Sequence, residues 1–298
     1  MPDLRSFLRP DVLSRIESLE LRARLVVEGF ITGLHRSPYH GFSVEFAEHR
    51  QYMPGDEIRA IDWKVYGRTD RYYIKQYEEE TNLKGYVVVD ASASMGYASE
   101  GNPTKFSYAT SLAAALALLM IRQRDAAGVG VYDTELRNYL PASSRGSYLQ
   151  EILRTLANAR TAGGTGTARS LHLMAERIRR RGLVIVISDF FDEPAQVISA
   201  LKHFRHKRNE VVAMQLLDPL ERTFNFGNDA TFRDMETGEE MVTQPYQIRA
   251  AYAQAMTDFT EHLKRECREH GIDYVLMDTA TPFDKALAEY LNKRKTMG

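Results

Sequence analysis

The stretch Tyr86-Val87-Val88-Val89-Asp90-Ala91-Ser92-Ala93-Ser94 joins a short apolar run directly to one carboxylate and two hydroxyls. A short, continuous apolar run is typical of a strand that is buried on both faces of a sheet. The polar residues therefore stand where that strand ends. Such an all-oxygen set suits a hard divalent cation, and almost no acid–base or nucleophilic group accompanies it. The stretch favours a protein that holds an ion in order to bind something over an enzyme.

The chain from residue 83 onward alternates between apolar strands and helices. We expect strands at Tyr86–Asp90, Gly128–Tyr132, Leu136–Leu140, Leu183–Ser188, Glu210–Leu217 and Ile272–Met277. We expect helices at Lys105–Arg124, Ser147–Ala159, Thr167–Arg181, Ala195–Lys207, Tyr246–Glu269 and Asp284–Lys293. Short apolar strands separated by helices indicate a sheet whose two faces are covered by helices. The sequence thus predicts an α/β fold with a doubly wound, mostly parallel sheet.

Residues 1–82 differ in character from residues 83–298, and we expect an N-terminal helix and β region followed by the α/β domain. In the N-terminal region we expect a helix over Asp11–Phe30, a turn over Met53–Asp56, and strands over Phe42–Phe46 and Tyr72–Tyr77. In the α/β domain, Gly238 lies in a turn signal between two short strand patterns. This pattern predicts a hairpin insertion near residues 221–244.

Composition bounds the location and the partners of the chain. The formal net charge of the 298 residues is −1, so no global field favours nucleic acid or an anionic membrane. The single cysteine, Cys267, permits no intrachain disulfide and no cysteine metal site, which fits reducing cytoplasm. The longest apolar stretch, Leu112–Ile121, is short of the about 20 residues that a membrane-spanning helix needs. We expect a cytoplasmic protein with no membrane span that binds no nucleic acid.

Oxygen side chains from three separate segments should meet at one edge of the predicted sheet. In open parallel sheets, ligands collect beyond the carboxyl ends of the strands, near the point where the strand order reverses. The segments supply Asp90, Ser92, Ser94, Thr165, Ser188 and Asp189. Two carboxylates neutralise a divalent ion, and neutral hydroxyls fill coordination positions without adding charge. The sequence therefore predicts a site for Mg²⁺ (or Mn²⁺) that stays electrophilic towards an acidic group of a partner.

The spacing Asp90-x-Ser92-x-Ser94, followed by Gly163-Gly164-Thr165 and Asp189, resembles the metal-ion-dependent adhesion site of von Willebrand factor type A domains. The resemblance implies that the two serine hydroxyls coordinate the ion directly. It implies that Thr165, Asp90 and Asp189 act directly or through water, and that a partner carboxylate completes the shell. The family often has glycine after the last aspartate, where this chain has Phe190-Phe191-Asp192. Asp192 is therefore an alternative ligand to Asp189.

A second resemblance covers about residues 30–130 and is more specific. Its segments are Gly41–Phe46, Arg50–Arg59, Ile61–Lys64, Arg68–Arg71 and Tyr77–Thr81. They resemble the bacterial domain-of-unknown-function family fifty-eight, with Gly67 as a minor departure. That resemblance implies a partner, a MoxR-type AAA+ ATPase, and a role in protein maturation or chaperone-like activity. The expected function is a non-enzymatic protein-interaction module.

Two other functions stay open. A metal-dependent hydrolase could use the same oxygen cluster, because a bound ion activates water, but the motif supplies no general base that is not already a ligand. A scaffold could bind its partner through the N-terminal region, where Trp63 and several tyrosines are interleaved with charges over 50–80. Alternatively, that stretch is an ordinary solvated surface with weak ion pairs and binds no partner.

Histidines and basic runs carry weaker signals. His35, His40 and His49 lack the tight spacing of a zinc site, which favours turn and surface histidines. The run Lys202–Arg208 near Arg179–Arg181 is better explained by cations at a helix C-terminus than by a nucleic-acid site.

Overall fold

A computed structural model describes residues 10–13, 17–35, 50–51, 63–74, 83–164, 166–227, 230–235, 238–283 and 287–288. Predictions for Phe42–Phe46, Met53–Asp56, His40 and His49 lie outside these residues. The predicted helix at Asp284–Lys293 lies outside them too, except for residues 287–288, which are helical.

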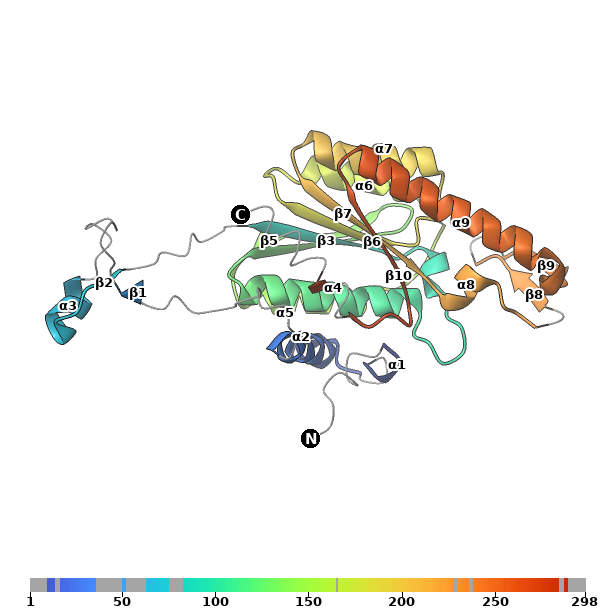
Figure 1. Ribbon diagram of the computed structural model, residues 1–298. Helices are drawn as coiled ribbons and strands as arrows, with labels where there is room; N and C mark the ends of the chain where they lie inside the picture. Colours follow the sequence, from blue (N-terminus) through green and yellow to red (C-terminus); the bar gives the residue numbers. More distant parts are fainter. Residues whose placement is uncertain are drawn as a thin grey trace.

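A six-stranded sheet forms the centre of the described chain, in the order β10-β7-β6-β3-β4-β5 (Figure 1). Its strands are β3 (Lys84–Asp90), β4 (Ala126–Tyr132), β5 (Leu136–Ser143), β6 (Leu183–Ser188), β7 (Glu210–Leu217) and β10 (Asp273–Asp278). All neighbours pair in parallel except β4 and β5, which are antiparallel. The predicted fold class, a doubly wound and mostly parallel sheet, is confirmed.

Helices cover both faces of this sheet (Figure 1). The long helices are α2 (Leu19–His35), α4 (Lys105–Arg122), α5 (Tyr148–Asn158), α6 (Thr167–Arg177), α7 (Pro194–His206) and α9 (Pro245–Glu269). One buried cluster joins β3, β4 and β6 to α4, α5 and α2, and a second joins the opposite face to α6, α7 and α9. Two cores separated by one sheet explain why the central strands are apolar on both sides.

Helix α4 is apolar nearly all round because it is covered on both sides. It packs on β3 and β4, and α2 lies across its outer surface. The Arg22 guanidinium of α2 donates to the hydroxyls of Ser107 and Ser111 at 3.3 and 3.0 Å. Helix α2 thus docks on the α/β part of the chain. No described helix has the length and apolar character that crossing a bilayer requires.

The N-terminal helix differs from its prediction. The expected single helix over Asp11–Phe30 is two helices, α1 (Pro10–Leu13) and α2. Ser18 explains the second start, because its hydroxyl accepts from the Leu21 N–H at 3.3 Å and so caps α2. Helix α6 also stops at Arg177, before the predicted Arg181, because Ile178 adopts an extended conformation.

Two short helices and two short strand pairs also belong to the described chain. They are α3 (Trp63–Thr69), α8 (Pro219–Thr223), the pair β1 (Arg50–Gln51) and β2 (Tyr73–Ile74), and the pair β8 (Ala230–Arg233) and β9 (Glu240–Thr243). The β8–β9 pair is antiparallel and lies within the stretch for which a hairpin was predicted. The division of the chain at residue 82 stays a prediction.

Candidate functional site

The strand order reverses between β3 and β6, and the predicted site residues follow those two strands. The chain runs from β3 outward through β4 to β5, and then returns to the other side of β3 with β6. Val89 pairs with Ile187 at the end of the ladder, so Asp90 and Ser188 emerge at the same level. The carboxyl ends of adjacent parallel strands at such a reversal are the usual ligand position in this fold class.

Asp90 is fully buried, and its carboxylate is held on both oxygens. Oδ1 accepts from the Ser92 N–H at 2.8 Å. Oδ2 accepts from the hydroxyls of Ser188 at 2.6 Å and Tyr132 at 3.3 Å. Burial raises the pKa of Asp90 to about 7, and the nearby charge of Asp189 adds to this, against the hydrogen bonds from Ser188 and Ser92. A cation beside these carboxylates would offset both effects.

The two serines and Asp189 form a continuous set of oxygens. Ser92 and Ser94 flank the start of the short 3₁₀ helix η3 (Ala93–Gly96), and their Oγ atoms are 3.1 Å apart. The Ser94 hydroxyl donates to Oδ2 of Asp189 at 2.8 Å. In an octahedral Mg²⁺ shell with bonds of about 2.1 Å, adjacent oxygens are about 3 Å apart. The spacing of these oxygens therefore fits neighbouring positions of one such shell.

The glycine loop lies against the serine turn. The Ala93 N–H donates to the Gly163 carbonyl at 3.3 Å, and the Ala162 N–H donates to the Ala91 carbonyl at 3.0 Å. Gly163 has a φ of +71°, which glycine adopts without steric cost. The backbone just before Thr165 is thus close to the serine turn, while Thr165 itself lies outside the described residues.

The loop after Asp189 takes the conformation that glycine would favour. Phe190 has a φ of +57°, in the left-handed region, and its side chain is buried. The Phe191 N–H donates to Asp189 Oδ1 at 3.1 Å, which leaves Oδ2 towards Ser94. Asp192 instead accepts from the Glu193 N–H at 2.7 Å. Asp189 is therefore the carboxylate that the structure brings to the serines.

A buried lysine, which the sequence reading missed, completes the site. Lys105 is the first residue of α4, and its ammonium lies 2.8 Å from Asp189 Oδ2 and 2.6 Å from Glu221 Oε1. Burial lowers the pKa of Lys105, but attraction by Asp189 and Glu221 outweighs it and holds the pKa above its ordinary value. Burial raises the pKa of Glu221, with Lys105 opposing the shift. A signal was present, because a cation at the start of an apolar helix opposes the helix dipole and needs an anionic partner.

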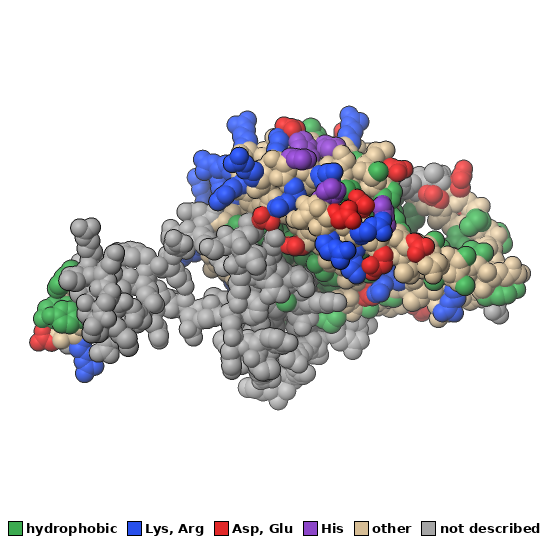
Figure 2. Space-filling model, turned by 45° about the horizontal axis from the view of Figure 1, so that its top comes forward, with side chains coloured by type: hydrophobic (Ala, Val, Ile, Leu, Met, Phe, Trp, Pro, Cys, Tyr) green, Lys and Arg blue, Asp and Glu red, His purple; other side chains and the backbone are tan. Residues whose placement is uncertain are grey.

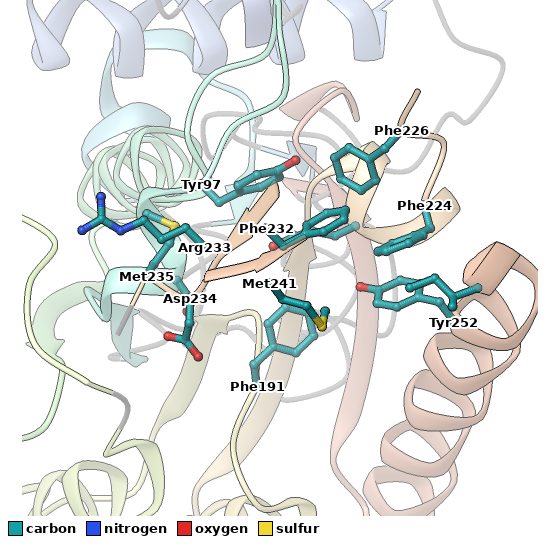
Figure 3. Close-up of a pocket in the computed structure, with 13 residues that line it drawn as sticks. Tyr97, Phe191, Phe224, Phe226, Phe232, Arg233, Asp234, Met235, Met241 and Tyr252 are labelled. Atoms are coloured by element: carbon teal, nitrogen blue, oxygen red, sulfur yellow. The ribbon is translucent and has the colours of Figure 1, made fainter. Parts of the chain in front are cut away.

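A pocket of 530 Å³ opens beside these oxygens, and its lining is mostly apolar and rich in aromatic rings (Figure 3). Its residues are Ser94, Tyr97, Phe191, Glu221, Phe224, Phe226, Phe232, Arg233, Asp234, Met235, Met241, Ile248 and Tyr252. The Phe224 ring stacks on Tyr252 with centroids 4.1 Å apart, and on Phe232 at 5.2 Å. Because Ser94 belongs to the lining, the apolar pocket adjoins the oxygen set.

The hairpin and the start of α9 also expose apolar side chains to solvent. Among them, Val242 is 79% exposed, Tyr246 59% and Met241 57%. An apolar patch of this kind next to a polar site is typical of a surface that binds another molecule. The sequence alone did not predict this apolar patch, because the patch depends on where the folded chain places the hairpin.

Other predicted candidates find local explanations. On the face that carries α6 and α7, Lys and Arg side chains gather at one end (Figure 2). Over the rest of that face, acidic and basic side chains are mixed. Glu176 pairs with Lys207 at 2.6 Å, and Arg205 pairs with Glu210 at 2.8 Å. Within the described residues, no group of three or more His, Cys, Asp or Glu side chains could hold a metal. The predicted ion site differs from such groups because serine hydroxyls, which are not among these side chains, join its carboxylates.

Residues 48–262 match the family described as "Protein of unknown function DUF58", and the chain belongs to that family. An uncharacterized protein of Mycobacterium tuberculosis is 26% identical, over 96% of this chain and 90% of its own. Among solved structures, the conserved hypothetical protein BatB from Bacteroides thetaiotaomicron has a TM-score of 0.50 and 18% identity. That match covers 72% of this chain and 99% of BatB. The VWA domain of SpRpn10 has a TM-score of 0.40 and 10% identity, over 70% and 94% of the two chains.

Proposed function

We propose that this chain is a non-enzymatic interaction module that binds Mg²⁺ or Mn²⁺ at a metal-ion-dependent adhesion site and, through the ion, an acidic residue of a protein partner. The observation that carries the proposal is the 2.8 Å contact between the Ser94 hydroxyl and Asp189, at the reversal of the strand order. It joins the serine turn after β3 to the carboxylate after β6. The proposed setting is the cytoplasm.

In this proposal, Ser92 and Ser94 supply the direct hydroxyl ligands. Asp90 and Asp189 neutralise the ion, directly or through water, and Thr165 adds a further hydroxyl. The hydrogen bonds to Asp90 from Ser188 and Ser92 fix that carboxylate before an ion arrives. A bound divalent ion would supply an electrophilic position for an anionic group of the partner.

The apolar pocket next to Ser94 favours a partner segment that carries an acidic residue beside a large apolar residue. The carboxylate would reach the ion while the apolar side chain enters the aromatic pocket. Buried aromatic anchors of this kind supply much of the affinity of protein interfaces. The family resemblance implies that the partner is a MoxR-type AAA+ ATPase, with a role in protein maturation or chaperone-like activity.

The carboxylates near the site are already hydrogen-bonded to other groups, which supports a binding role over hydrolysis. A hydrolase would need a base that is not bound to the ion. Asp90 is already held by Ser188 and Ser92, and the Glu221 carboxylate is bound by Lys105 and by the Asp218 N–H at 2.7 Å. We therefore assign no reaction to the site.

The test is titration calorimetry of the full chain with Mg²⁺ and Mn²⁺, followed by binding to the ATPase with and without a chelator. We expect Ser92→Ala and Asp90→Ala to abolish ion binding, and chelation to weaken the complex at least tenfold. Ser144→Ala serves as the control, because Ser144 is exposed and follows β5 at the edge of the sheet opposite to Asp90. An affinity for the ATPase that is unchanged after chelation and in Asp90→Ala would contradict the ion-bridged mechanism.

A further inference from the structure

Lys105 is a completely buried cation inside the proposed ion site. Its side chain is 0% exposed, and Nζ contacts two carboxylates, Asp189 at 2.8 Å and Glu221 at 2.6 Å. The ammonium also lies 5.0 Å from the centroid of the Phe191 ring, a favourable position for a cation. Three groups on two segments, the loop after β6 and helix α8, thus hold one ammonium in a fixed place.

The ammonium and Ser94 share the same acceptor atom. Oδ2 of Asp189 accepts from Lys105 Nζ and from the Ser94 hydroxyl, both at 2.8 Å. Through Ser94, that oxygen is linked to Ser92, whose Oγ lies 3.1 Å from the Ser94 Oγ. A divalent ion held by the serine hydroxyls and Asp189 would therefore meet a positive charge that is already bound to one of its ligands.

We propose that Lys105 sets the ion affinity of the site by acting as a tethered cation that competes with the divalent ion for Asp189, with Glu221 as the acceptor to which the ammonium withdraws. This inference rests on the ion site proposed above. It assigns to Lys105 and Glu221 a role in regulating that site, which neither residue would have as part of an ordinary ion pair.

The charges of the described site fit two cations better than one. Asp90, Asp189 and Glu221 carry three negative charges when ionised, and Lys105 carries one positive charge. The remaining two negative charges match one divalent ion. With no ion bound, the ammonium protects Asp189 from being a buried, unpaired carboxylate, which would be costly.

Glu221 makes the withdrawal possible without leaving the ammonium unpaired. Its Oε1 accepts from Lys105, while its Oε2 accepts from the Asp218 N–H at 2.7 Å and so fixes the carboxylate at the start of α8. Lys105 can therefore give up its contact with Asp189 and keep the one with Glu221. The ion affinity then reflects the balance between these two carboxylates for one ammonium.

The experiment is titration calorimetry of the full chain with Mg²⁺ and Mn²⁺ for the wild type, Lys105→Met, Glu221→Gln and the double variant. We expect Lys105→Met to bind the ion at least tenfold more tightly, because the competing charge is gone. We expect Glu221→Gln to bind it about tenfold more weakly, because Lys105 then has Asp189 as its remaining carboxylate. Glu221→Gln should weaken ion binding less when it is added to Lys105→Met than when it is added to the wild type, since Lys105→Met leaves no ammonium to redirect.

Lys207→Met is the matched control, because Lys207 pairs with Glu176 on the α6–α7 face and should leave the ion affinity unchanged. If Lys105→Met does not fold, the double variant supplies the test, because it removes both members of the pair. The tethered-cation role would be overturned if the wild type binds the ion and neither Lys105→Met nor the double variant binds it more tightly. That result would leave the ion site in place. The absence of ion binding from every variant would instead overturn the ion site itself.

Discussion

The Ser94 hydroxyl donates a 2.8 Å hydrogen bond to Asp189, a residue 95 positions further along the chain. This contact links the turn after β3 to the loop after β6, and it places both residues where the strand order reverses. The first loop supplies Ser92 and Ser94, and the second supplies the Asp189 carboxylate. The site exists because the sheet topology brings the two loops together.

The pH dependence of stability should report the environment of Asp90 when no divalent ion is bound. Its pKa is raised to about 7 in the folded chain, first by burial and then by Asp189, so the folded state holds a proton that the unfolded state releases near pH 4. This contribution to stability is present below about pH 4 and is lost as the pH rises through about 7. The stability lost by pH 8 is on the order of 4 kcal/mol.

The measurement is urea unfolding in the presence of a chelator, from pH 4.5 to pH 8, for the wild type and Asp90→Asn. The wild type should lose stability relative to Asp90→Asn as the pH rises. Parallel curves for the two proteins would show that Asp90 titrates normally.

Gly166 should tolerate no side chain, because it lies against the backbone of Thr134. A Cβ added at Gly166 would be 2.7 Å from Thr134 Cα and from its carbonyl oxygen. We expect Gly166→Ala to lower the free energy of unfolding by about 1–3 kcal/mol, as overpacking does. It should also weaken ion binding, because the loop that carries Thr165 must shift.

Gly146→Ala is the matched control, since nothing lies within 4 Å of its added Cβ. Its stability should equal that of the wild type or exceed it slightly. Equal unfolding midpoints for the two alanine variants would contradict the close approach of Gly166 to Thr134.

The apolar surface of the hairpin should affect binding to the partner without affecting the ion. Met241 is 57% exposed and lines the pocket next to Ser94. Met241→Asp should therefore leave the fold and the Mg²⁺ affinity unchanged and weaken binding to the ATPase at least tenfold, because a charge in an apolar contact must be desolvated. Leu173→Asp, at a residue of α6 that is 44% exposed, is the control and should bind the partner normally. Equal losses in both variants would indicate a general effect of charge.

Cys267 should be unreactive in the folded protein. It is buried in α9, and burial raises its pKa to about 12, so almost none of it is thiolate near neutral pH. Iodoacetamide at pH 8 should leave the native chain unmodified and should label it in urea. The measurement is intact mass, and rapid labelling of the native chain would contradict the burial of this helix face.

Local patterns were reliable where packing agreed with them. The apolar runs that became β6 and β7 were predicted at the bounds that the structure has. Helix ends were less certain, because capping by Ser18 and the extended Ile178 depend on one side chain or one backbone angle. Periodicity averages over several residues and does not detect either event.

The sequence by itself determined the parallel α/β sheet and the oxygens at its edge, because apolar runs and the polar residues that end them are local properties. It could place Asp90, Ser92 and Ser94 together, since they are neighbours in the chain. Only the tertiary structure decided that Asp189 meets Ser94 and that Lys105 is held between Asp189 and Glu221. The reason is physical: a buried ammonium is stable only where several carboxylates surround it, and the fold supplies those carboxylates from loops that are remote in sequence.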